Sequence, residues 1–149
     1  MTIFRNFKLP EIEIFPASTK ILLELPYVKE GISAGFPSPA DDFIDTAIDL
    51  NHELIKHPSS TFFGRVRGDS MKDLGIHNGD LLVIDKSLEP ASGKVAVCYV
   101  DGEFTVKSLK IEKDNIWLLP ANNSYKPILV TKENDFMIWG IVTNVIKSF

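Results

Sequence analysis

Hydrophobic and polar residues alternate with a period of two along most of the chain after Ser60, a pattern typical of β-strands with one buried face. Turn-forming residues interrupt the alternation, and Asp101-Gly102 between two apolar runs is a strong hairpin signal. The pattern predicts strands over Thr61–Arg67, Asp80–Asp85, Lys94–Val100, Glu103–Ile111, Asn115–Leu119 and Phe136–Val145. We therefore expect a mainly β fold.

The one helix signal lies just before these strands, between Asp41 and His57. Two acidic residues open this segment and suit the first turn of a helix, where the backbone N–H groups attract negative charge. Apolar residues then mostly recur at helical spacing, at Phe43, Ile44, Ala47, Ile48, Leu54 and Ile55. We expect one short helix here and assign residues 41–149 to a single β-rich domain.

Residues 1–40 have a different pattern, because prolines recur through them and leave no room for a helix of useful length. Short alternating pieces such as Glu11–Phe15 suit an edge strand that adds to a sheet. The stretch from Gly31 to Pro39 is rich in small residues and proline, which predicts extended, accessible backbone. We interpret residues 1–40 as an N-terminal arm that lies on the domain.

Composition and charge argue against several classes of protein. The chain has 149 residues and a net charge of −4, which argues against a protein that binds nucleic acid through its phosphate backbone. Its single cysteine, Cys98, lies in an apolar run and is interpreted as a buried strand thiol. The longest apolar stretch, Phe136–Ile146, is too short to cross a bilayer, and no signal peptide is visible. We expect a cytoplasmic protein.

Ser70 is the first candidate for chemistry, because the turn Gly68-Asp69-Ser70 directly follows a predicted strand. Taken alone, these three residues favour a polar turn over a nucleophile. A serine hydroxyl needs a base to act as a nucleophile, and a histidine is the usual one. The histidines His52, His57 and His77 have no orienting carboxylate and no companions at metal-ligand spacing. We interpret them as surface residues and expect no metal or other cofactor.

Lys107 is the alternative base. It alternates with Thr105 and Leu109 along a predicted strand, and the period alone favours a lysine that faces solvent. A lysine acts as a base only when it is uncharged, and apolar cover favours that form. Residues of the arm such as Ile32 and Phe36 are candidates for this cover.

Several segments of the chain together resemble the LexA-type family of self-cleaving proteins. The matching segments are Gly68-Asp69-Ser70-Met71, Gly75-Ile76, Gly79-Asp80-Leu81 and Val106-Lys107. Others are similar to the UmuD branch of that family, namely Gly35–Ala40, Ile48–Asn51, Ile55–Thr61 and Asp101–Lys107. The resemblance runs from about Gly35 to the C-terminus.

The resemblance implies a fold and a set of site residues. It implies a LexA/UmuD-like catalytic domain with curled β-sheets, one short helix and an extended N-terminal arm. Ser70 matches the nucleophile, Lys107 the base that takes its proton, and Ala34-Gly35 the bond that is cut. Small residues beside that bond fit a backbone that bends tightly into a Ser–Lys cleft.

The resemblance also implies a function and partners. Proteins of this branch belong to the SOS response to DNA damage, and a RecA filament on single-stranded DNA stimulates their self-cleavage. The trimmed homodimer then serves a UmuC-type Y-family polymerase as the accessory subunit for error-prone translesion synthesis. No direct sequence-specific DNA binding and no membrane association are expected.

Two other functions stay open. One is a LexA-like or phage-type regulator without its DNA-binding domain, and the other is a non-catalytic interaction module. The segment before Ala34-Gly35 is too short and too rich in proline for a helix-turn-helix domain, which favours the UmuD branch over a repressor. That segment is also longer than expected for the UmuD branch, so its first residues have no assigned role.

Overall fold

The computed structural model describes residues 11–17, 24–28 and 44–149. The chain divides into two compact units. The larger unit contains residues up to Ala17 together with Ser59–Phe149, and the smaller unit is Ser18–Pro58. The predicted boundary between arm and domain, near residue 40, lies outside the described residues.

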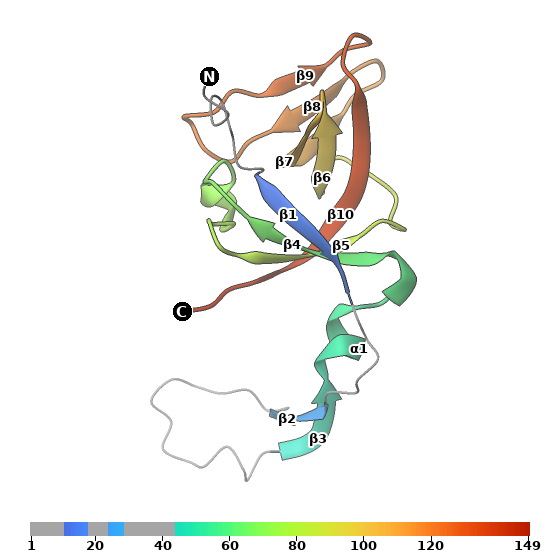
Figure 1. The fold of residues 1–149 in the computed structure, drawn as a ribbon, viewed down its shortest axis with the longest axis vertical. Helices are drawn as coiled ribbons and strands as arrows, with labels where there is room; N and C mark the ends of the chain where they lie inside the picture. Colours follow the sequence, from blue (N-terminus) through green and yellow to red (C-terminus); the bar gives the residue numbers. More distant parts are fainter. Residues whose placement is uncertain (1–10, 18–23, 29–43) are drawn as a thin grey trace, which may run out of the picture. The chain divides into compact units, whose positions relative to one another are not determined.

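The larger unit is built on one eight-stranded antiparallel sheet with the order β1-β4-β5-β10-β6-β7-β8-β9 (Figure 1). Its strands are β1 (Ile12–Pro16), β4 (Thr61–Val66), β5 (Leu81–Asp85), β6 (Val95–Val100), β7 (Glu103–Ile111), β8 (Ile116–Leu119), β9 (Ile128–Val130) and β10 (Phe136–Ile146). The prediction of a mainly β fold is therefore confirmed. The Asp101-Gly102 hairpin joins β6 to β7, and both turn residues have a positive φ, of 48° and 92°.

The longest strand, β10, gives the sheet its curl. Its first half pairs with β6, from Phe136 opposite Val100, and its second half pairs with β5, ending with Ile146 opposite Leu81. The register shifts at two places, between Ile138 and Gly140 and between Val142 and Asn144. Such bulges bend a strand and increase its twist, so β10 passes from one half of the sheet to the other (Figure 1).

The curl encloses two neighbouring clusters of buried apolar side chains, one around Leu82, Ile84 and Val97 and the other around Cys98 and Leu118. The Cys98 side chain is fully buried, and this burial raises the pKa of its thiol to about 12. The interpretation of Cys98 as a buried strand thiol is confirmed.

Strand β1 adds to the free edge of β4, with Ile12 opposite Val66 and Pro16 opposite Phe62. Ile12 is buried and packs in the first cluster, close to the position that a Cβ at Gly64 would take. An edge position suits a strand that ends in proline, which has no N–H to donate. The expectation that Glu11–Phe15 supplies an edge strand is confirmed.

The described residues of the smaller unit form a two-stranded sheet, in which β2 (Glu24–Val28) pairs with β3 (Ile44–Asp49), and one α-helix, α1 (Leu50–Leu54). The prediction of a helix between Asp41 and His57 was therefore wrong for residues 44–49, which form β3. The β-branched residues of this stretch alternate along the chain and suit a strand. The helix begins only after Asp49, whose carboxylate caps it by accepting from the Asn51 N–H at 3.0 Å.

Within the described residues, no helix combines the length and the apolar character that a membrane crossing requires.

A buried carboxylate ties the C-terminal residues to the turn before β5. The Asp80 carboxylate accepts a hydrogen bond from the His77 N–H at 2.8 Å and another from the Lys147 ammonium. Burial raises the pKa of this carboxyl, but the hydrogen bonds and the charge of Lys147 outweigh that effect and hold it below its ordinary value. The ionised form therefore stabilises the fold.

We expect Asp80→Asn to lower the free energy of unfolding at neutral pH by about 1.5–3 kcal/mol, the usual range for a hydrogen bond to a charged group. A carboxyl with a lowered pKa stabilises the fold above its unfolded-state value of roughly 3.9, and this contribution is lost as the pH falls through the folded-state value. The difference between the proteins should therefore shrink in acid. Urea unfolding at several pH values measures it, with the exposed Asp73→Asn as the control. A difference that does not depend on pH would contradict the prediction.

Candidate functional site

Ser70 lies on a tight turn that follows β4. Gly68 has a φ of 91°, in the left-handed region that favours glycine, and its N–H donates to the Asn78 side-chain oxygen at 3.0 Å. After Ser70 the chain forms a short 3-10 helix, Lys72–Leu74. The Ser70 residue is only 6% exposed. The turn therefore points the hydroxyl into the body of the larger unit, not into solvent.

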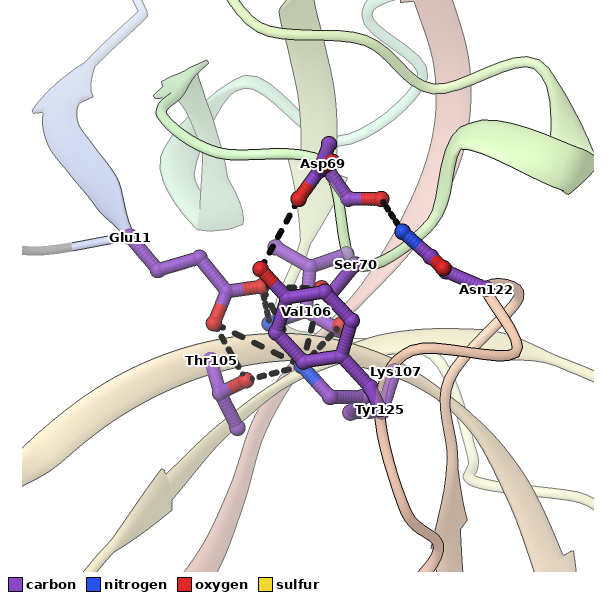
Figure 2. Close-up of polar contacts among 8 residues, drawn as sticks. All are labelled: Glu11, Asp69, Ser70, Thr105, Val106, Lys107, Asn122 and Tyr125. Atoms are coloured by element: carbon purple, nitrogen blue, oxygen red, sulfur yellow. Dashed lines mark hydrogen bonds and ion pairs between the residues drawn. The ribbon is translucent and has the colours of Figure 1, made fainter.

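A second loop, residues 121–125, holds the backbone of this turn. The Ala121 N–H donates to the Ser70 carbonyl at 2.8 Å, and the buried Asn122 amide donates to the Asp69 carbonyl at 3.0 Å. Tyr125 donates its hydroxyl to the Asp69 carboxylate at 2.8 Å (Figure 2), and this hydrogen bond raises the pKa of the phenol. Asparagine is common in turns, and nothing local in the sequence indicates this long-range role of Asn122.

Lys107 enters the site from β7 and meets Ser70. Its Nζ lies 3.0 Å from Ser70 Oγ, 2.6 Å from Thr105 Oγ1 and 3.0 Å from the Val106 carbonyl oxygen. The residue is 4% exposed, so the expectation from periodicity of a lysine that faces solvent was wrong. Both faces of β7 are buried here, because Thr105 and Lys107 are covered on one face and Val106 on the other. A curled sheet covers a middle strand on both sides, which alternation along one strand does not reveal.

The structure adds a residue that sequence reasoning missed. Glu11, directly before β1, points its carboxylate into the site (Figure 2). One oxygen accepts from Ser70 Oγ at 2.8 Å and from Lys107 Nζ at 3.2 Å, and the other accepts from Thr105 Oγ1 at 2.7 Å. Glu11 and Lys107 form an ion pair, and the lysine side chain in this pair is almost fully buried. No sequence pattern places Glu11 here, because the contact depends on how β1 aligns with β4.

The other candidate residues lie elsewhere. His77 contacts the Lys147 ammonium at 3.1 Å, and His52 and His57 belong to the smaller unit. The predicted cleavage site, Ala34-Gly35, falls outside the described residues. In the described parts of the chain, no three His, Cys, Asp or Glu side chains gather as they would around a metal ion. Four side-chain groups meet in the site: the hydroxyls of Ser70 and Thr105, the amine of Lys107 and the carboxylate of Glu11.

Comparisons with known proteins find similar sequences over most of the chain. A family model described as Peptidase S24-like matches residues 26–143. Protein SamA of Salmonella typhimurium is 44% identical over 135 residues, which are 91% of this chain and 94% of SamA. Protein MucA of Escherichia coli is 38% identical over 136 residues, covering 90% of this chain and 92% of MucA.

A LexA repressor is also similar, but over a smaller share of its length. LexA repressor 2 of Xanthomonas axonopodis pv. citri is 40% identical over 126 residues, which are 85% of this chain and 58% of the repressor. Together these matches confirm the resemblance to UmuD-type proteins of the LexA family. The chain belongs to the Peptidase S24-like family.

Proposed function

We propose that this protein is a self-cleaving serine peptidase of the SOS mutagenesis type, in which Ser70 is the nucleophile, Lys107 is the base and the bond between Ala34 and Gly35 is cut. The observation that carries the proposal is the 3.0 Å distance between Lys107 Nζ and Ser70 Oγ, with both residues buried. A serine needs a base within hydrogen-bond reach, and the lysine is at that distance.

The proposed reaction has two steps. Ser70 Oγ attacks the carbonyl carbon of Ala34 while an uncharged Lys107 takes the hydroxyl proton, and the lysine then gives that proton to the departing nitrogen of Gly35. A water molecule then attacks the ester between Ser70 and Ala34 and gives a proton to Lys107. The lysine passes this proton to Ser70 Oγ as the ester bond breaks, which frees the Ala34 carboxyl group and restores the serine. Thr105 Oγ1, at 2.6 Å from Nζ, holds the amine in place for these transfers.

A shared polypeptide would favour the proposed reaction. The bond to be cut and the catalytic groups belong to the same polypeptide, so their effective concentration is high once the arm enters the site. A partner acts on such a reaction by favouring the state in which the arm is docked. We assign this role to a RecA filament on single-stranded DNA.

The product of the cut, residues 35–149, is proposed to form a homodimer that joins a UmuC-type Y-family polymerase in the cytoplasm. The similarity to SamA and MucA, which spans more than nine-tenths of both relatives, supports this role over that of a repressor. The net charge of −4 also fits a protein that reaches DNA through its partners, not by its own contacts.

Mass spectrometry of the purified protein tests the peptidase directly. Incubation at about pH 9–10 should produce fragments 1–34 and 35–149 faster than incubation at neutral pH. An amine must be uncharged to take a proton, and a higher pH increases the uncharged fraction of an amine. Ser70→Ala should abolish both fragments, whereas Ser124→Ala, an exposed serine of the neighbouring loop, should leave the rate unchanged.

Two results would overturn the proposal. Fragments that form equally fast in Ser70→Ala would show that another group cuts the chain. If the unaltered protein gives no fragment at alkaline pH or with the filament, the remaining function is that of a non-catalytic interaction module.

A further inference from the structure

Strand β1 holds Glu11 at a fixed place beside the proposed catalytic pair. The Glu11 carbonyl accepts from the Arg67 N–H at 2.6 Å, which continues the pairing of β1 with β4 by one residue. The next side chain, Ile12, is 3% exposed and packs in the core. The Glu11 side chain itself is 26% exposed. Glu11 is thus anchored through its backbone and its neighbour, while its partly exposed side chain contacts Ser70 and Lys107.

The hydrogen bonds in the site run in the wrong direction for catalysis. The Ser70 hydroxyl has a single proton, and Glu11 Oε1, which has none to give, accepts it at 2.8 Å. Ser70 Oγ can then only accept from Lys107 Nζ. The proposed reaction needs the reverse, with the hydroxyl donating to an uncharged amine. While Glu11 is bound, the proton of the nucleophile is directed away from the base.

Glu11 also occupies space that the substrate needs. A carbonyl carbon under attack must approach the nucleophile to about 3–3.5 Å. Glu11 Oε1 already lies 2.8 Å from Ser70 Oγ, and the Val106 N–H points at the same oxygen from 3.4 Å. A peptide carbonyl and this carboxylate therefore compete for one position in front of Ser70.

We propose that Glu11 is a built-in inhibitor of self-cleavage, which must leave the site before the Ala34-Gly35 bond enters it. This inference rests on the proposed function and adds a regulatory group to the same site. The docked carboxylate lowers the fraction of molecules that are competent to react, and the observed rate falls in proportion to that fraction. The other acid next to the site, Asp69, is engaged by Tyr125 and does not contact the lysine in the structure.

The test compares cleavage rates at neutral pH without the filament. Glu11→Ala removes the carboxylate and should speed the appearance of fragments 1–34 and 35–149 by about tenfold or more. Glu13→Ala is the matched control, because Glu13 lies two residues away on the same strand and pairs with the exposed Arg67 outside the site. Its rate should equal that of the unaltered protein. Ile12→Ala loosens β1 without touching a site residue and should also speed cleavage.

The outcomes separate this inference from the proposed function. If the unaltered protein is cut at alkaline pH but Glu11→Ala is cut no faster at neutral pH, Glu11 does not inhibit and the inference is wrong, while the peptidase stands. A slower cut in Glu11→Ala would make the carboxylate a helper and would also overturn the inference. If no variant is cut under any condition, the peptidase itself fails and the inhibitor with it.

Discussion

Replacing Lys107 with methionine is expected to lower the rate of self-cleavage by about a thousandfold or more, the usual scale for the loss of an essential base. Methionine has a similar length and no polar head, so it fills the buried space along β7 but takes no proton from Ser70. Lys107 is only 4% exposed, so an apolar side chain of similar volume suits its surroundings and should leave the fold intact. Glu11, which loses its ionic partner, is partly exposed and can turn toward water.

The experiment measures fragment formation at alkaline pH, where the unaltered protein should react fastest. Lys110→Met, three positions further along β7, is the control, because Lys110 is exposed and pairs with Glu112 outside the site. Urea unfolding of both variants shows that the fold is intact. A Lys107→Met protein that is cut at the normal rate would remove the amine from the mechanism.

Replacing Ile84 with alanine is expected to lower the free energy of unfolding by about 3–5 kcal/mol, at the upper end of the range for core truncations. Ile84 is fully buried on β5, between two strands that carry glycine beside it. A Cβ built at Gly64 would lie 2.9 Å from its Cδ1, and one built at Gly140 would lie 2.6 Å from its Cγ2. The isoleucine thus fills the space that both glycines leave, and neither glycine has a side chain to refill the cavity.

Urea unfolding in a Ser70→Ala background measures this loss without interference from cleavage. Leu129→Ala on β9 is the control, since Leu129 is 37% exposed and its truncation should cost less than about 1 kcal/mol. A loss below about 1 kcal/mol for Ile84→Ala would mean that the neighbouring strands collapse into the cavity, contrary to the packing in the structure.

The strands of the larger unit were predictable because alternation is a local property of a chain with one covered face. The hairpin at Asp101-Gly102 was predictable for the same reason, since its two turn residues prefer a positive φ. The strand Ile128–Val130 was missed because three residues are too few for a period to show. The strand Ile44–Asp49 was mistaken for helix because its apolar residues also fit helical spacing, and pairing with Glu24–Val28 selects the strand.

Some features of the candidate site were likewise predictable from the sequence, and others were not. Ser70 could be placed on a turn after a strand from its neighbours alone, and the family resemblance paired it with Lys107. Periodicity gave the wrong environment for that lysine, because burial depends on how β10 bends the sheet around β7. The position of the Ala34-Gly35 bond relative to the pair remains a prediction.

Local chemistry along the chain thus accounts for most of the strands, the hairpin and a serine at the end of a strand. Long-range pairing accounts for the 3.0 Å approach of Lys107 to Ser70 and for the contact of the Glu11 carboxylate with both residues. Glu11 is separated from Lys107 by 96 positions, and no pattern of neighbouring residues encodes such a contact. It arises because β1 joins the edge of β4 in a single register, where burial of Ile12 aligns the preceding glutamate with the site.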